Sequence, residues 1–157
     1  MTTYFAQNGT VYIDTGDGNE TEVLAVQNCT IEVQMEANDL YGWGSIKRVA
    51  SARHEAKVNV TIEYANILTE DFFKYILDPS AGTTGLATGV SIADTTSHHY
   101  FTIRAVIPSS DNLYDLDITA EDVYFVNLPF TGELGEWVKM NLEGHGADVT
   151  VKQVAHQ

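Results

Sequence analysis

Five histidines are the side chains of this chain best suited to bind a transition metal, but their spacing argues against a shared site. His98 and His99 are adjacent, and adjacent side chains on an extended chain point to opposite faces. No His-x-His pair occurs, and a single cysteine is available to join them. A zinc site combines several such ligands close together, so we predict no metal site. We expect His145, which lies between two glycines, in a loop. The five are His54, His98, His99, His145 and His156.

An acidic run at residues 14–20, Asp-Thr-Gly-Asp-Gly-Asn-Glu, superficially resembles a calcium-binding loop. An EF-hand needs oxygen ligands at fixed positions and a closing bidentate glutamate, and this run lacks both the spacing and that glutamate. We interpret it as an acidic turn, with weak cation binding as the alternative. The glycine patterns of serine hydrolases, P-loops and dinucleotide sites do not occur either. We therefore predict neither enzymatic activity nor a cofactor.

A second acidic group surrounds a predicted strand near residues 113–128. Carboxylates are usually found at protein surfaces, where water solvates them. We therefore expect this group to form a solvated face, and its members are Asp111, Asp115, Asp117, Glu121 and Asp122.

The charge balance is strongly acidic. The chain has 157 residues with 8 Lys and Arg against 22 Asp and Glu, a formal net charge of −14. Such a surface repels polyanions, which excludes tight electrostatic binding of nucleic acid. The charge fits either simple solubility or a surface that nucleic acid must pass without sticking. No apolar run approaches the ~20 residues that span a bilayer, and the first residues lack the regions of a secretory signal, so we expect no membrane segment.

Two long stretches of alternating character are the elements most able to position a functional surface. Residues 29–36 carry apolar side chains at odd positions, and residues 55–64 carry them at even positions. Side chains alternate between the faces of a strand, so each stretch has one apolar and one polar face. Turn formers and aromatics at 38–46 connect the two, which predicts a long β-hairpin. Cys29 lies on the apolar face, where we expect a buried small hydrophobe without a catalytic role.

The remaining pattern predicts one mainly β domain over residues 1–157. We expect strands at 9–14, 23–37, 48–65, 98–107 and 113–128, and a closing strand from Trp137 that changes phase at a β-bulge near Gly144–Gly146. Residues 66–77 have helical spacing, with Thr69 as the expected cap and Pro79 as the stop. A Gly- and Thr-rich loop follows at 80–96. Together these elements make about seven strands with one short flanking α-helix and a long protruding β-hairpin. This composition indicates a β-sandwich or a partly closed barrel.

The long hairpin raises the question of what covers its edges. Isolated two-stranded ribbons are marginally stable and expose unpaired backbone groups. Pairing with the same ribbon of neighbouring copies would satisfy those edges, and a closed ring of such ribbons would enclose a wet channel. The alternative is an ordinary hairpin buried within one sandwich.

Several segments resemble the major tail tube proteins of long-tailed phages and archaeal tailed viruses. The resemblance rests on Asp-Leu-Tyr-Gly-Trp-Gly-Ser at 39–45 and on the alternating strand after it, Ile46–Val58. It also includes the Phe- and Leu-containing helix at Glu70–Leu77 and the Gly-His-Gly step at 144–146. These pieces occur in the family's order along most of the chain.

The resemblance implies a β-sandwich that forms hexameric rings, stacked into a hollow tube with an acidic lumen for viral DNA. It implies self-assembly, contacts with the tape measure, tail terminator and distal tail proteins, passage of DNA without tight binding, no membrane, and a place in the virion tail after synthesis in the host cytoplasm. The loop at 38–47 would contact an adjacent ring through Leu40, Tyr41, Trp43 and Ile46, with the Gly82–Gly89 loop as a second candidate. The lumen-facing residues would be Glu32, Gln34, Glu36, Asn59, Thr61 and Glu63.

Three alternatives stay open at this point. The tube subunit of a secretion or contractile injection machine shares this architecture. A monomeric ligand-binding β-sandwich could use Tyr41 and Trp43 as a platform for a sugar. Finally, the aromatics of the loop at 38–47 could fold back and cover the sandwich of their own chain in place of contacting an adjacent ring.

Overall fold

The structure, a computed structural model, describes residues 9–24, 26–44, 46–64, 72–129 and 139–157, together with Tyr4 and Leu134. Eight strands form in this part of the chain, and their order in the sequence is interrupted by one helix, α1 (Lys74–Leu77), and one 3-10 turn, η2 (Leu86–Thr88). The strands are β1 (Thr10–Asp14), β2 (Glu20–Glu22), β3 (Val26–Tyr41), β4 (Arg48–Tyr64), β5 (Phe101–Pro108), β6 (Tyr114–Phe125), β7 (Met140–Gly146) and β8 (Asp148–Ala155).

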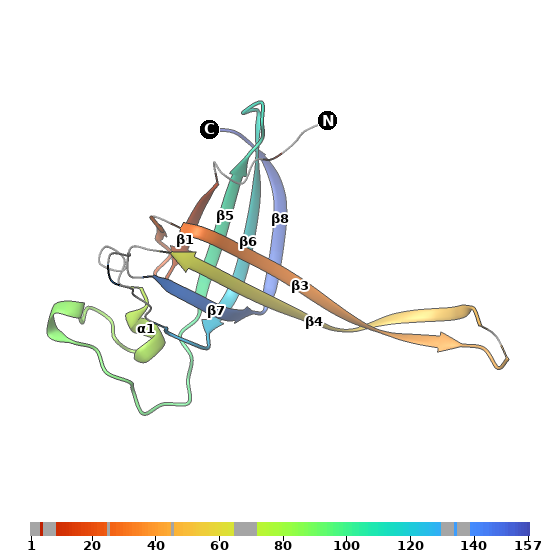
Figure 1. Ribbon diagram of the computed structural model, residues 1–157, viewed down its shortest axis with the longest axis horizontal. Coiled ribbons are helices and arrows are strands. Elements are labelled where there is room, and N and C mark those ends of the chain that lie inside the picture. Colours follow the sequence, from red (N-terminus) through yellow and green to blue (C-terminus); the bar gives the residue numbers. More distant parts are fainter. Residues whose placement is uncertain are drawn as a thin grey trace.

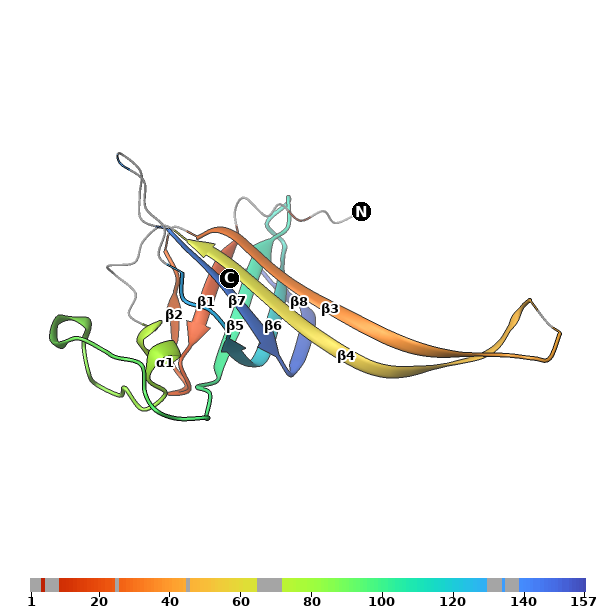
Figure 2. The same ribbon diagram turned by 60° about the horizontal axis from the view of Figure 1, so that its bottom comes forward.

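The strands make two antiparallel layers that face each other (Figure 1, Figure 2). One layer contains β2, β1, β5, β6 and β8, and the other contains β3, β4 and β7. The end of β6 joins the two layers, because Tyr124 and Phe125 pair with His145 and Gly144 of β7. The predicted mainly β sandwich is therefore confirmed. The strands do not form a closed barrel, since β2 and β3, at the two ends of the strand order, do not pair with each other.

The core lies between the two layers and follows the predicted alternation. Inward side chains of β4 and β7, such as Ile62 and Leu142, are fully buried, while their sequence neighbours point outward. Burial of this kind contributes roughly 1.5–3 kcal/mol for each large apolar side chain. The largest fully buried side chains are Ile13, Val60, Ile62, Tyr64, Phe101, Ile103, Val123, Met140 and Leu142.

The closing strand differs from the prediction. Gly144 and Gly146 pair regularly with Val60 and Val58, so no β-bulge occurs there. The expectation of His145 in a loop is also wrong, because His145 lies in β7 and pairs with Asn59. The interruption lies at Ala147, whose backbone N–H donates to the Glu121 carbonyl. Before it, β7 pairs with β4, and after it, β8 pairs with β6 in the other layer. The phase change therefore marks a strand that turns a corner of the sandwich.

Gly144 is required for a packing reason. A Cβ at this position would lie 2.9 Å from the Tyr124 carbonyl oxygen and 3.0 Å from Cδ1 of Phe125. We expect Gly144→Ala to lower the free energy of unfolding by about 2–3 kcal/mol, because the backbone must shift to relieve the overlap. Gly85→Ala is the matched control, since no atom lies within 4 Å of its added methyl group. Denaturant unfolding of both variants measures the difference, and equal stabilities would contradict the packing argument.

One end of the sandwich is covered by α1 (Figure 2), with Phe72 and Phe73 just before it in the core. Phe72 packs its ring against Tyr64 and Phe101, with centroids 5.8 and 6.2 Å away. The helix is a single turn, and the expected cap at Thr69 lies outside the described residues. Lys74 is buried and its Nζ donates to the carbonyl oxygens of Gly82 and Thr84, each at 2.9 Å. These two hydrogen bonds attach the Gly- and Thr-rich loop to the helix.

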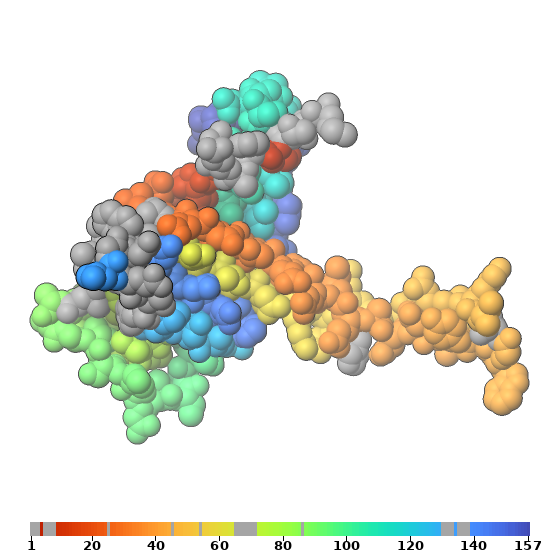
Figure 3. Space-filling view, viewed as in Figure 1, coloured from red at the N-terminus to blue at the C-terminus, as the bar shows by residue number. Residues whose placement is uncertain are grey.

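The predicted hairpin is longer than expected and projects from the body (Figure 1, Figure 3). The first strand continues to Tyr41, because Asn38 and Asp39 pair with Ala52 and Ser51 in place of forming a turn. Only residues 58–64 of β4 also pair with β7, so the rest of the hairpin is a two-stranded ribbon. We call residues 33–57 the arm. In the part of the chain that is described, no helix has the length and hydrophobicity needed to cross a membrane.

Candidate assembly surfaces

The polar side of the β3–β4–β7 layer is the first candidate surface. Residues directly opposite each other in an antiparallel pair share a face, so the register shows which side chains lie together. Glu32 lies opposite Asn59, and Asn59 lies opposite His145. We call the outward side chains of these three strands the polar face; over the body they are Asn28, Thr30, Glu32, Asn59, Thr61, Glu63, Asn141, Glu143 and His145.

Sequence reasoning brought together the β3 and β4 members of this face but missed those of β7. Glu143 lies opposite Thr61, and Asn141 lies opposite Glu63. The alternation of apolar Met140 and Leu142 could have identified the outward residues of β7. It could not have identified β4 as the partner strand, because that contact is long-range.

The polar face changes in character across the layer. The side nearest β6 carries hydrogen-bonded and stacked rings, which the β3 edge lacks among the described residues. His145 Nδ1 donates to Asn59 Oδ1 at 3.0 Å, and the ring of Tyr124 lies 5.7 Å from that of His145. Tyr124 in turn stacks on His98 with centroids 4.2 Å apart. Each of the three strands also contributes one carboxylate to this face over the body, namely Glu32, Glu63 and Glu143.

Two of the predicted polar residues, Gln34 and Glu36, lie on the arm and not over the body. Gln34 Nε2 donates to Glu32 Oε1 at 3.1 Å, and Glu36 forms an ion pair with Lys57 at 3.6 Å. Both members of that ion pair are more than half exposed, so it contributes little stability. Lys57, opposite Gln34, also places a positive charge among the acidic side chains.

The outer edge of β3 is a second candidate surface. Among the described strands, β3 pairs with β4 alone, so the backbone groups along its other side have no strand partner. β3 is 16 residues long, far beyond the short edge strands with which proteins usually avoid edge-to-edge pairing. An edge of this length suits the addition of a strand from another chain.

The tip of the arm is the third candidate surface, and it holds the predicted anchors. The exposed fractions are 61% for Leu40, 54% for Tyr41, 106% for Trp43 and 97% for Ile46. The turn between the strands uses Gly44 at φ 72°, a conformation that favours glycine. Because the arm projects away from the body, these side chains do not cover their own sandwich (Figure 3). The alternative in which they fold back is therefore wrong.

The residues first considered for chemistry have structural contacts instead. Asp14 Oδ1 accepts hydrogen bonds from the backbone N–H groups of Gly16 and Gly18, as in an acidic turn. His99 stacks on Tyr75 with centroids 4.3 Å apart, and its ring nitrogens face the carbonyls of Pro79 and Thr15. Burial raises the pKa of the Cys29 thiol to about 11, so it is protonated and unreactive at neutral pH. Within the described ranges, no three His, Cys, Asp or Glu side chains are placed to hold a metal ion.

The expectation of a solvated acidic face on β6 is wrong for Asp117. This residue is 4% exposed, and its carboxylate accepts a hydrogen bond from Arg104 of β5 at 3.1 Å. Arg104 was not singled out from the sequence. The contact depends on β5 and β6 lying side by side with Arg104 opposite Thr119, which no local pattern indicates.

Comparison with known proteins shows that the fold is similar to that of chains in a tube-terminating cap, a contractile injection system and a virion. No protein-family model matches the sequence, and no curated protein matches it. Solved structures do match, among them a chain of the anti-feeding prophage tube-terminating cap with TM-score 0.62 and 8% identity, covering 92% of this chain and 88% of that chain. A chain of the sheath–tube complex of an extracellular contractile injection system has TM-score 0.61 and 7% identity, covering 92% and 88%. A chain of a gene transfer agent virion has TM-score 0.60 and 9% identity, covering 98% and 100%. At these identities the likeness is one of fold.

Proposed function

We propose that this protein is the structural subunit of a viral tail tube. The observation that carries the proposal is the arm, a two-stranded ribbon with a free edge and an uncovered apolar tip on an otherwise complete sandwich. The arm adds no packing to the sandwich of a monomer. Large exposed apolar groups usually mark contacts between proteins. The fold likeness to chains of a tube-terminating cap, a sheath–tube complex and a virion supports the same role.

In this proposal, copies of the chain close into hexameric rings that stack into a hollow tube. The polar face lines the bore, with Glu32, Asn59, Thr61 and Glu63 over the body and Gln34 and Glu36 on the arm. The formal charge of −14 per copy repels phosphate from the wall, so that DNA slides without being trapped. Tight binding would stop a polymer that must pass completely.

The tip of the arm, in this proposal, contacts an adjacent ring through Leu40, Tyr41, Trp43 and Ile46. The Gly82–Gly89 loop is a second contact. Other tail proteins, namely the tape measure, terminator and distal tail proteins, bind the finished tube or its ends. The protein acts without enzymatic chemistry and resides in the virion tail.

Negative-stain microscopy of the purified, concentrated protein tests the proposal. We expect rings or hollow tubes of uniform diameter, and light scattering should show a mass that rises with concentration. A protein that stays monomeric at every concentration, with the arm protected from proteases, would overturn it.

A tube subunit of a contractile injection machine is the second candidate, favoured by the fold likeness to two such machines. Both candidates predict the same tubes in micrographs. Mass spectrometry of purified particles separates them: the protein should occur in DNA-containing virions if it is a viral tail subunit. Its occurrence only in DNA-free particles would favour the injection machine.

A further inference from the structure

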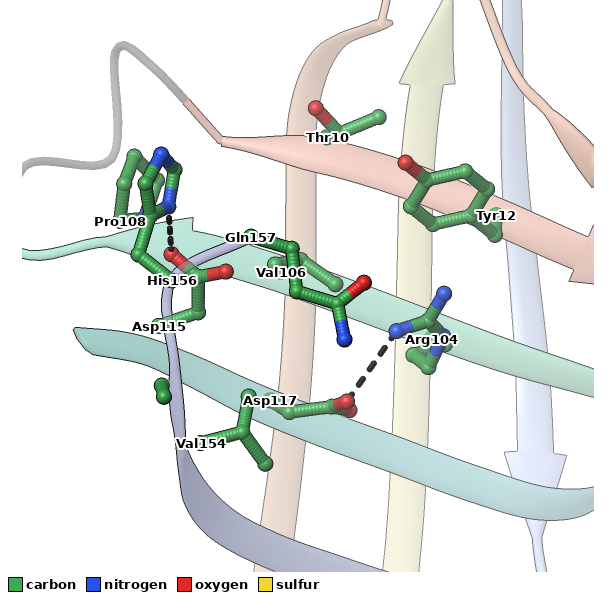
Figure 4. A pocket seen from close by; sticks show the side chains of 11 residues that line it. Thr10, Tyr12, Arg104, Val106, Pro108, Asp115, Asp117, Val154, His156 and Gln157 are labelled. Carbon is green, nitrogen blue, oxygen red and sulfur yellow. Dashed lines mark hydrogen bonds and ion pairs between the residues drawn. The ribbon is translucent and has the colours of Figure 1, made fainter. Parts of the chain in front are cut away.

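The outer side of the β1–β5–β6–β8 layer contains an open groove of about 470 Å³, on the opposite side of the sandwich from the polar face (Figure 4). Its walls combine apolar and charged side chains. Val106, Pro108 and Val154 supply apolar surface, and Tyr12 lies beneath the guanidinium of Arg104, 4.7 Å from ring centroid to Cζ. Asp115, Asp117 and His156 also line it.

The groove carries an excess of carboxylate. Arg104 donates to Glu20 through Nε and Nη2 at 2.9 and 2.7 Å, and through Nη1 to Asp117 at 3.1 Å. Hydrogen bonding to Glu20 raises the pKa of Arg104 above its ordinary value, so this cation is permanent. Asp115 forms a further contact with His156 Nδ1 at 2.7 Å. Among the lining residues, the carboxylates of Asp115 and Asp117 outnumber the single guanidinium of Arg104, so the groove has a negative formal charge when His156 is neutral.

Positive charge is concentrated elsewhere in the chain, on the arm. Of the 8 Lys and Arg, the arm holds four, against three of the 22 Asp and Glu. The arm therefore has a formal charge of +1 and the rest of the chain −15. Two of the arm's carboxylates, Glu36 and Asp39, already face Lys57 and Arg48 at 3.6 Å. The four cations are Lys47, Arg48, Arg53 and Lys57.

We propose that the groove receives the tip of the arm of a second copy of this chain, with Leu40, Tyr41, Trp43 and Ile46 and the neighbouring Lys47. This inference rests on the tube assembly proposed above and names the surface that the arm contacts. The occupant follows from charge and shape together: the arm is basic with an apolar tip, and the groove is acidic with an apolar floor. A second hollow of about 380 Å³, between β1, β3 and β5, has no charged side chain in its lining and offers the arm no such complement.

Complementary charge matters more here than in an ordinary interface. Two copies that each carry −14 repel each other over most of their surfaces. Contact between a +1 arm and an acidic groove replaces part of that repulsion with attraction and selects the orientation of approach. Desolvation of the aromatic and aliphatic tip against Val106, Val154 and Tyr12 would supply most of the affinity.

Filling the groove tests whether it is an interface. Val154 lines the groove on β8, and Thr150 lies on the same strand and the same face, outside it. We expect Val154→Trp to raise the protein concentration needed for tubes at least tenfold, and Thr150→Trp to leave it unchanged. Circular dichroism of dilute samples checks that both remain folded. Tubes formed equally well by both variants would overturn the inference, while a wild-type protein without tubes would instead contradict the proposed function.

A charge exchange tests whether the arm is the occupant. Lys47→Glu, next to Ile46 at the tip, and Asp115→Lys should each raise the concentration needed for tubes about tenfold, and the two together in one chain should restore it. Asp148→Lys makes the same charge change at the far end of β8 and should not rescue Lys47→Glu. If the paired exchange fails to restore tubes while the single variants lose them, the groove does not receive the arm.

Discussion

Replacing Trp43 and Tyr41 together by alanine is expected to abolish long tubes while the chain stays folded. Both side chains are exposed at the arm's tip, at 106% and 54%, so their removal takes no packing from the sandwich. Aromatic anchors of an interface typically contribute ~2–4 kcal/mol each, so the pair would weaken assembly by at least a hundredfold.

Circular dichroism and micrographs of the same preparation measure the two effects separately. Ile92→Ala combined with Leu113→Ala is the matched control, because these side chains are similarly exposed, at 82% and 61%, but lie on the body. Tubes of normal length from the double alanine variant would show that the tip is not an assembly element. Loss of tubes from the control as well would show that any exposed apolar group matters.

Reversing the charge of Glu32 and Glu36 is expected to permit assembly but stop genome delivery. The change to lysine places two cations on the polar face of each copy, beside Lys57. In a ring these cations would line the bore and attract phosphate, so that DNA binds the wall in place of sliding along it. We expect infectivity to fall at least tenfold with particle yield preserved.

Particle counts by microscopy and plaque assays on the same stock measure this effect. The matched control is Glu121→Lys with Asp148→Lys, which makes the same change in net charge on the other layer, where the two residues pair with each other. Unaltered infectivity of the Glu32 and Glu36 variant would remove these residues from the lumen. Equal losses in both variants would attribute the effect to net charge alone.

Alternation along the two long strands was sufficient to assign their faces. Glu32 and Asn59 were predicted on one side, and the register places them directly opposite each other. This works because strand geometry sends successive side chains to opposite faces whatever surrounds the strand. The same alternation puts Ile62 on the apolar side of its strand, and this side chain is fully buried.

The groove and the corner of the sandwich were not predictable in this way. The burial of Asp117 depends on Arg104 from a different strand and on Glu20, which is 84 residues before Arg104. The change of phase after Gly146 has the same local signature for a bulge and for a strand that turns into the other layer. Only the partner strands, β4 before Ala147 and β6 after it, distinguish the two.

The sequence by itself determined that a long hairpin exists, which side of it is polar, and that its tip is rich in aromatic and aliphatic residues. It did not determine that the hairpin projects, because alternation is identical in a ribbon that is buried and in one that stands alone. That was decided by the tertiary structure: β7 has seven residues and covers β4 only from Val58 to Tyr64, so the remainder of the hairpin has no neighbouring strand to pack beside.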